Sequence, residues 1–248
     1  MSLTNAFDKL CDATLSLLYP RPCAVCGVRS VETRGDAPAC ADCWAATRVF
    51  GNDDTLCWKC GALGVGTLPE GVRVLVRCRR CDAEAFDAAR ACGAYEGALR
   101  AFVLGLKREP FVSERVARML CEARGRAPLD TTTLVVPVPL HRERERERGF
   151  NQANLLGRAL ANRSGLRLDE WSLVRVSHSE RHRAGMDARA RRESVSDAFA
   201  VVRPRLVEGE SVLLVDDVFT TGATVSACAR ALKAAGVREV SVLTVARA

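Results

Sequence analysis

The chain has 248 residues, enough for one sizeable domain and a smaller module beside it. Its formal net charge of +7 favours anionic partners such as nucleotides or nucleic acid. No run of about 18 apolar residues occurs, so we expect no membrane span and a cytoplasmic location.

The first predicted element is a short amphipathic helix in residues 1–19. Phe7, Leu10, Leu17 and Leu18 recur with helical spacing and would form its apolar face. Acidic residues interrupt the apolar run and no small-residue cleavage site follows, so a signal peptide is not expected. We expect this helix to dock on the rest of the protein.

Residues 20–84 contain four Cys-x-x-Cys pairs. In a zinc knuckle the two thiolates of such a pair point at one ion, and two knuckles complete a tetrahedral site. Both gaps between neighbouring pairs, 13 and 17 residues, fit a two-site ribbon in which neighbours share a metal. An interleaved arrangement, first pair with third and second with fourth, stays open. The pairs are Cys23/Cys26, Cys40/Cys43, Cys57/Cys60 and Cys78/Cys81.

These pairs predict two structural Zn²⁺ sites. A disulfide framework is disfavoured in the cytoplasm, and a redox motif needs only one such pair beside a βαβ unit. Four thiolates leave no open coordination position, so the module is expected to bind or brace and not to react. Apolar residues are sparse here, so metal binding should supply much of the folding energy. Cys11, Cys92, Cys121 and Cys228 are expected to be small core residues.

The second region, residues 85–248, begins with a strand expected over residues 88–95. Two helical patterns follow, over residues 96–107 and 112–123, separated by Pro110. Lys107 ends the first helix, where it could reach an anionic ligand or interact with the helix dipole. Residues 133–139 are a short apolar run stopped by prolines and predict another buried strand.

An alternating run of arginine and glutamate extends from His141 to Arg148. If the run is extended, its four arginines lie on one side and form a row that can bind phosphate groups. If it is helical, the same residues make intrahelical ion pairs worth about 0.3 kcal/mol each. Both alternatives stay open, with Arg146 and Arg148 as candidate pyrophosphate ligands. The following Gly-Phe-Asn-Gln opens a helix that runs to Asn162.

Residues 212–224 combine a strand, two acids and a hydroxyl-rich loop. Val212 to Val215 form a continuous apolar run, typical of a strand buried on both faces of a parallel sheet. Asp216 and Asp217 follow it. Next come the loop Thr220, Thr221, Gly222, Ala223 and Thr224, a helical pattern that ends at Gly236, and a last strand over residues 239–245.

This order of elements predicts a cradle for a phosphate and a ribose. Backbone N–H groups at the helix N-terminus favour a phosphate dianion, and the threonine hydroxyls can donate to its oxygens. Asp216 and Asp217 are placed to accept hydrogen bonds from the vicinal hydroxyls of a ribose. An ordinary N-capped helix explains one capping residue, but not two acids and three threonines. Walker A and Gly-x-Gly-x-x-Gly fingerprints are both missing.

The same segment resembles the PRPP-binding motif of type I phosphoribosyltransferases. The resemblance implies that Asp216 and Asp217 hold the ribose 2′ and 3′ hydroxyls and that Thr220 to Thr224 wrap the 5′-phosphate. It also implies that Mg²⁺ accompanies PRPP. In such enzymes a mobile loop closes over PRPP. Our candidate is residues 177–192, with residues 188–192 as a helical part.

The whole chain closely resembles the ComF family of competence-associated, phosphoribosyltransferase-like proteins with an N-terminal zinc ribbon. The motifs are the Cys-x-x-Cys pairs, Val-Pro-Val-Pro-Leu-His at 136–141, Arg-Gly-Phe-Asn-Gln at 148–152 and the acidic motif. The resemblance implies a parallel sheet flanked by helices, a double zinc ribbon over residues 20–84 and a phosphoribosyltransferase-like domain over residues 85–248. Relatives carry Thr-x-x-Gln and then Leu in the mobile loop, where this chain has Ser179-Glu-Arg-His182 and Met186, so loop contacts do not carry over.

Three functions are compatible with these motifs. The first is a protein that binds PRPP and handles single-stranded DNA during natural transformation, with other DNA-uptake proteins as partners. The second is an active phosphoribosyltransferase with an unknown nitrogen acceptor, in which Asp216 and Asp217 are catalytic beside a developing oxocarbenium ion. The third is a PRPP sensor without turnover. The sequence shows no base-binding pocket, so we rank the first function highest.

Overall fold

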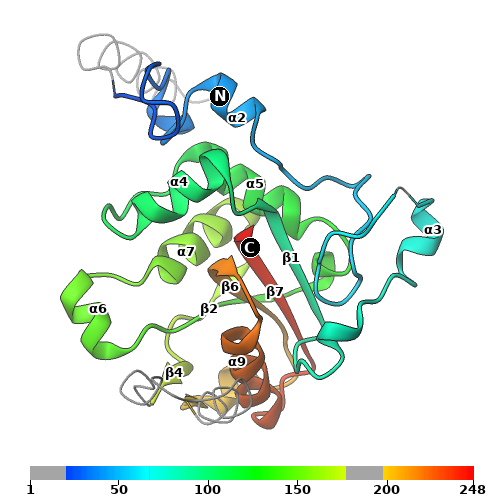
Figure 1. The fold of residues 1–248 in the computed structure, drawn as a ribbon. Helices are drawn as coiled ribbons and strands as arrows, with labels where there is room; N and C mark the ends of the chain where they lie inside the picture. Colours follow the sequence, from blue (N-terminus) through cyan, green and yellow to red (C-terminus); the bar gives the residue numbers. More distant parts are fainter. Residues whose placement is uncertain (1–20, 67, 177–197) are drawn as a thin grey trace, which may run out of the picture.

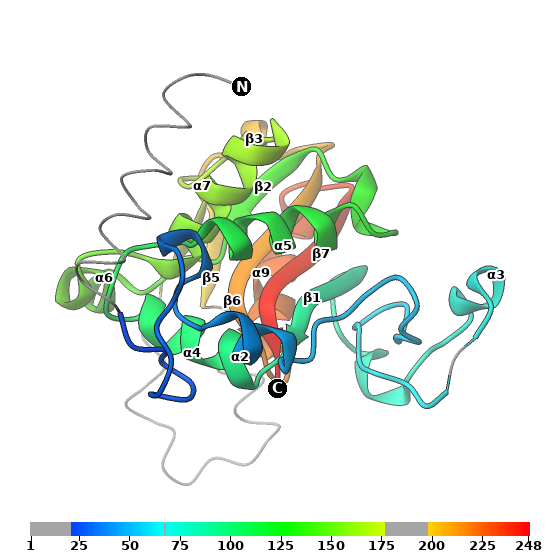
Figure 2. The ribbon, with the colours of Figure 1, turned by 90° about the horizontal axis from the view of Figure 1, so that it is seen from above.

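The computed structural model describes residues 21–66, 68–176 and 198–248 (Figures 1 and 2). The predicted N-terminal helix, Cys11 and the predicted mobile loop over residues 177–192 lie outside these ranges.

A five-stranded parallel sheet forms the centre of the molecule (Figure 1). Every neighbouring pair of strands is parallel. The predicted architecture, a parallel sheet flanked by helices, is therefore confirmed. The strands stand in the order β1 (Ala88–Ala94), β7 (Glu239–Arg247), β6 (Ser211–Phe219), β2 (Leu134–Pro137) and β3 (Arg167–Leu168).

Helices cover both faces of the sheet, as Figures 1 and 2 show. Successive residues of a strand point to opposite faces, so a continuous apolar run in β6 serves two cores. Leu213 and Val215 pack in the core under α4 (Gly97–Leu106), α5 (Glu114–Arg124) and α7 (Gln152–Ser164). Val212 and Leu214 pack in the other core, with α9 (Ala223–Ala234) and the antiparallel pair β4 (Leu173–Arg175) and β5 (Phe199–Val201).

The alternating run of arginine and glutamate forms the helix α6 (Arg142–Arg148). The side chain of His141 accepts a hydrogen bond from the Glu143 N–H at its start, and Gly149 ends it with φ +82°. These two caps favour the helix, so the extended alternative, with four arginines in one row, is wrong. The next helix, α7, begins at Asn151, whose side chain accepts from the Ala153 N–H at 3.0 Å.

The cysteine-rich segment lies along the outer edge of β1. The Phe50 N–H donates to the Cys92 carbonyl at 2.8 Å, and the Ala89 N–H donates to the Lys59 carbonyl at 2.6 Å. These bonds extend the sheet beyond its last strand. Other short helices in the described ranges are α2 (Ala41–Ala45), α3 (Glu70–Arg73), η1 (Arg34–Asp36), η2 (Arg79–Cys81), η3 (Leu129–Thr131) and η4 (Pro204–Leu206).

Candidate functional site

The acidic pair lies on β6 near its carboxyl end. The strand continues through Asp216 and Asp217 to Phe219, because its pairing with β7 persists as far as Phe219 and Arg247. Asp216 and Asp217 are both half-buried. They are adjacent on the strand, so their side chains leave the backbone in opposite directions.

Residues 220–224, called loop 220–224 below, join β6 to the N-terminus of α9. Gly222 adopts φ +83°, and a Cβ atom at this position would lie 2.9 Å from Cζ of Phe219. Glycine is therefore required both by the backbone conformation and by the space above the ring. Thr220, Thr221 and Thr224 are exposed. The first N–H groups of α9 have no partner within the helix. That of Ala223 donates to Oγ1 of Thr221 at 3.4 Å, and the next ones remain for an anion.

A small cavity of about 40 Å³ opens beside this loop. The cavity lies between Asp216, the turn that follows β6 and the first residues of α9. The structure thus brings Asp216 and most of loop 220–224 around one space, whereas Asp217, the other acid of the predicted cradle, does not line it. The lining residues are Asp216, Val218, Phe219, Thr220, Gly222, Ala223, Thr224 and Val225.

The carboxyl of Asp216 has an unusual environment. Burial raises its pKa to about 7, and the negative charge of Asp217 acts in the same direction. The Asp217 N–H, which donates to Oδ1 of Asp216 at 2.9 Å, and the charge of Lys107 act in the opposite direction. Lys107 follows the last residue of α4 and is exposed. The positive charge of Lys107 therefore acts on Asp216.

The other candidate anion ligands lie on α6. This helix follows the carboxyl end of β2, which is the neighbour of β6 in the sheet. Arg146 is exposed and Arg148 is half-buried. Asn151 fixes the segment behind them, because its Nδ2 donates to the Val138 carbonyl at 3.0 Å. The Gly-Phe-Asn-Gln motif thus holds the start of α7 against the end of β2.

Eight cysteines form two groups that could hold metal ions. Neighbouring Cys-x-x-Cys pairs come together in each group, so the interleaved alternative is not the arrangement found. The sulfur atoms of each group lie within 4.8 Å of one another. The first cysteine group is Cys23, Cys26, Cys40 and Cys43, and the second cysteine group is Cys57, Cys60, Cys78 and Cys81.

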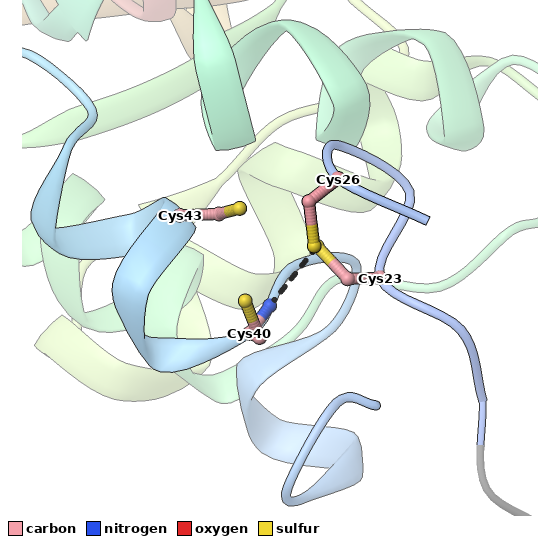
Figure 3. A group of neighbouring side chains, drawn as sticks. All are labelled: Cys23, Cys26, Cys40 and Cys43. Carbon is pink, nitrogen blue, oxygen red and sulfur yellow. Dashed lines mark hydrogen bonds between the residues drawn. The ribbon is translucent and has the colours of Figure 1, made fainter. Parts of the chain in front are cut away.

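Figure 3 shows the side chains of the first cysteine group, of which Cys23 and Cys40 are buried. The Cys40 N–H donates to Sγ of Cys23 at 3.3 Å, and Cys26 is exposed. Burial raises the pKa of the Cys23 thiol, but N–H donors from Cys26, Cys40 and Val25 outweigh it and lower the pKa to about 6. Backbone donors of this kind stabilise a thiolate, which is the form that binds zinc.

The second cysteine group is more deeply enclosed, since Cys57, Cys60 and Cys81 are all buried. Sγ of Cys57 lies 3.7 Å from Sγ of Cys81, and Sγ of Cys60 lies 3.5 Å from Sγ of Cys78. Four sulfurs placed tetrahedrally at about 2.3 Å from a zinc ion are about 3.8 Å apart. The spacing therefore fits Zn²⁺. The cysteines that the structure describes form no disulfide bond.

Sequence reasoning missed three residues that connect the second cysteine group to loop 220–224. They are Phe86, Phe219 and Arg247. The rings of Phe86 and Phe219 meet edge to face with centroids 5.8 Å apart. The Arg247 guanidinium lies 4.4 Å from the centre of the Phe219 ring. No motif contains Phe86 or Arg247, and nothing in the motif at residues 212–224 indicates a role for the ring of Phe219; only the fold brings the three together.

Comparisons with known proteins agree with this architecture. Residues 152–248 match a family model described as a phosphoribosyl transferase domain. The chain is 33% identical over 143 residues to competence protein F of Haemophilus influenzae, covering 56% of this chain and 62% of that protein. It is 31% identical over 150 residues to DNA utilization protein YhgH of Salmonella typhimurium, covering 58% and 64%. The chain thus spans less than two thirds of the length of these two relatives.

A third relative is matched over almost its whole length. The chain is 29% identical over 239 residues to DNA utilization protein YhgH of Escherichia coli, covering 93% of this chain and 99% of that protein. Among solved structures, a glutamine phosphoribosylpyrophosphate amidotransferase from Bacillus subtilis has a TM-score of 0.35 and 22% identity, over 51% of this chain and 24% of its own. None of the helices in the described ranges is long and apolar enough to span a membrane.

Proposed function

We propose that this chain, a homologue of the ComF competence proteins, binds PRPP or a related ribose phosphate and acts in handling single-stranded DNA during uptake. The assignment of a ribose-phosphate ligand rests on one observation: the acidic pair on β6 lies directly before loop 220–224 and the N-terminus of α9. The DNA role rests on relatives whose names refer to competence and DNA utilization.

Each part of the cradle has a distinct role in this proposal. Asp216 and Asp217 accept hydrogen bonds from the 2′ and 3′ hydroxyls of the ribose. Loop 220–224 and the first N–H groups of α9 bind the 5′-phosphate. Lys107, Arg146 and Arg148 face the pyrophosphate, and Mg²⁺ bound with PRPP would neutralise part of its charge.

The two cysteine groups would hold structural Zn²⁺ in the same proposal. Four thiolates complete the tetrahedral coordination of zinc, so neither site has a position for a substrate. The division into a ribbon over residues 20–84 and a phosphoribosyltransferase-like domain over residues 85–248 follows the end of the second cysteine group. The ribbon then serves as a brace for the domain and as a surface for other ligands.

A basic surface on the ribbon supports contact with DNA. Arg77, Arg79 and Arg80 are exposed and flank Cys78 and the buried Cys81. Guanidinium groups on one exposed turn can neutralise successive backbone phosphates without reading the bases. Affinity would therefore depend strongly on salt and weakly on sequence.

An active phosphoribosyltransferase is the second candidate, and the pKa of Asp216 favours it. A carboxyl with a pKa of about 7 can take the proton from a nitrogen acceptor near neutral pH. In that case Asp216 and Asp217 would also lie beside the positive charge that develops on the ribose when pyrophosphate leaves. A sensor that binds PRPP without turnover would use the same cradle.

Isothermal titration of the zinc-loaded protein with Mg·PRPP, with and without a short single-stranded DNA, tests the proposal. Binding of PRPP that changes the DNA affinity would support a ligand-dependent DNA-handling protein. PRPP binding without any DNA affinity would favour the transferase, and release of pyrophosphate in the presence of candidate acceptors would then identify turnover. A chain that binds no PRPP would contradict both functions.

A further inference from the structure

We propose that the second cysteine group sets the position of loop 220–224 through Arg247, so that its metal and the ribose-phosphate ligand bind cooperatively. The inference rests on the proposed function, because it concerns the same ligand site. In this proposal Arg247 is a positioning residue, which contacts neither the ribose-phosphate ligand nor the metal ion.

Arg247 makes the central contact. It ends β7 and pairs in register with Phe219, the last residue of β6. Nη1 donates to the Cys60 carbonyl at 2.6 Å, and Nη2 lies 3.8 Å from Sγ of the same cysteine. The guanidinium also stacks on the Phe219 ring, 4.4 Å from its centre. One side chain therefore joins a metal-ligating residue to the base of the ligand loop.

The Phe219 ring forms the floor of that loop. A Cβ atom on Gly222 would meet Cζ of Phe219 at 2.9 Å and Cε1 of Phe86 at 3.5 Å. The backbone of loop 220–224 thus rests directly on the two rings. A shift of Phe219 must move the N–H groups that would bind the 5′-phosphate, because no side chain separates ring and backbone.

The chain that leaves the second cysteine group makes another contact with the ligand site. Four residues after Cys81, the Ala85 N–H donates to Oγ of Ser226 at 2.8 Å. Ser226 lies in the first turn of α9. The next residue, Phe86, supplies the ring that meets Phe219 edge to face. Both ends of the second group's metal-binding segment are therefore fixed to the loop or to the helix behind it.

Charge strengthens this connection when a metal is bound. A zinc ion with four thiolates carries a net charge of −2, which attracts nearby guanidinium groups. Arg247 lies beside Cys60, and the buried Arg90 donates to the Trp58 carbonyl at 2.9 Å. Loss of the metal would remove the geometry that holds Cys60, and with it the anchor of Arg247.

The first cysteine group has no comparable connection. Its nearest stacked arginine is Arg115 of α5, which lies 5.2 Å from the ring centre of Trp44 and donates to Asp36 at 2.7 Å. Across the described ranges, no hydrogen bond or ring contact joins this group to loop 220–224. The two groups therefore predict different responses to the ligand, and Arg115 provides a matched control for Arg247.

The test measures zinc transfer from the full-length, zinc-loaded protein to a chromogenic chelator, with and without saturating ribose 5-phosphate. Binding coupling is reciprocal, so a metal that organises the loop must itself be held more tightly when the loop is occupied. At equilibrium with the chelator, we expect ribose 5-phosphate to raise the affinity for one of two zinc ions by about tenfold and to leave the other unchanged.

Variants separate the positioning role from general stability. Arg247→Met should keep two zinc ions, abolish the ligand-dependent protection and weaken ribose 5-phosphate binding by about tenfold. Arg247→Lys should restore part of the protection, because an ammonium can still donate to the Cys60 carbonyl. Arg115→Met should leave the protection intact.

The outcomes distinguish the two proposals. A wild-type protein that binds no ribose 5-phosphate or PRPP would contradict the proposed function, and this inference with it. A wild-type protein that binds the ligand but holds both zinc ions with unchanged affinity would overturn the inference alone. Unaltered protection in Arg247→Met would do the same. The wild-type measurement decides the question even if a variant fails to fold.

Discussion

The Asp217 N–H donates a hydrogen bond of 2.9 Å to Oδ1 of Asp216. The two acids of the cradle are thus joined through a backbone group while their side chains diverge. Burial and the charge of Asp217 raise the pKa of Asp216 to about 7. The acidic pair therefore takes up a proton more readily than two ordinary carboxyls would.

The first prediction concerns the stability of the protein as a function of pH. The folded-state pKa of Asp216 lies above its ordinary value, so the folded state binds this proton more tightly than the unfolded state. The resulting stabilisation is complete at low pH and is lost as the pH rises through about 7. Asp216→Asn removes the cost of charging the buried group. The variant should be more stable than the wild type by about 2 to 4 kcal/mol at pH 8.5.

Chemical denaturation at pH 5, 7 and 8.5 measures this difference, and the two proteins should differ least at pH 5. The charges that act on Asp216 come from Asp217 and Lys107, so Lys107→Met should accentuate the loss at high pH. Parallel stability curves for wild type and Asp216→Asn would contradict the raised pKa.

The second prediction concerns the acidic pair as a ligand for ribose. Asp216→Asn combined with Asp217→Asn should weaken ribose 5-phosphate binding by about 100-fold or more, because two charge-assisted hydrogen bonds are lost. Zinc content should stay unchanged. Asp53→Asn, at an exposed acid of the ribbon, is the control. Unchanged binding in the double variant, measured by calorimetry, would refute the cradle assignment.

The third prediction compares two glycines with similar backbone angles. Gly222→Ala introduces a Cβ at φ +83° against the Phe219 ring, whereas Gly165→Ala, at φ +72°, meets no atom within 4 Å. Both should lose about 1 kcal/mol to backbone strain. Only Gly222→Ala should lose more stability than this and also lose phosphate affinity. Thermal unfolding and ribose 5-phosphate titration together check this, and equal behaviour of the two variants would count against it.

The fourth prediction concerns DNA. Replacing Arg77, Arg79 and Arg80 with glutamine should weaken binding of single-stranded DNA. It should also reduce the magnitude of the negative slope of log K against log salt by about 2. The expected slope follows from about 0.7 per phosphate contact on a single strand. A control with Arg203 and Arg205, exposed near η4, should leave the slope nearly unchanged. Fluorescence anisotropy at several salt concentrations measures both, and an unchanged slope in the triple variant would exclude this surface.

The fifth prediction concerns the metal ions, with about two zinc ions expected per chain because two cysteine groups are formed. Cys26→Ser and Cys60→Ser should each lose one. Cys26 is exposed, so its loss should affect the domain little. Cys60 is buried, and without its metal the backbone whose carbonyl accepts from Arg247 is no longer held in place, so Cys60→Ser should destabilise the sheet. Elemental analysis and thermal unfolding test this; the reverse order of stability would contradict the different roles of the two groups.

Local patterns in the sequence were sufficient for much of the fold. The apolar run from Val212 to Val215 predicts a strand buried on both faces, and its alternate residues do pack in two cores. The length of β6 could not be predicted, because the strand is prolonged to Phe219 by pairing with β7 and not by its own composition. The resemblance to the ComF family is confirmed by the relatives named for competence and DNA utilization.

Only part of the candidate site could be predicted from the sequence. Asp216, Asp217 and loop 220–224 are contiguous, so a single motif contains them. The electrostatic effect of Lys107 on Asp216 and the bond from Arg247 to Cys60 connect segments far apart in the chain. Such contacts depend on the order of strands in the sheet, which residue spacing alone does not specify. Likewise, gap lengths left two pairings of the cysteines open until the fold selected one.

The ribbon segment forms hydrogen bonds along the outer edge of β1. This covering affects the tendency of the protein to aggregate at high protein concentration. β1 is the last strand on its side of the sheet, and backbone groups of Phe50 and Lys59 occupy its outer edge. An uncovered strand edge is a template for pairing with another chain. A molecule stripped of its metal ions would expose this edge, so zinc starvation should cause aggregation in addition to the weaker ligand binding expected from loss of the second group's metal.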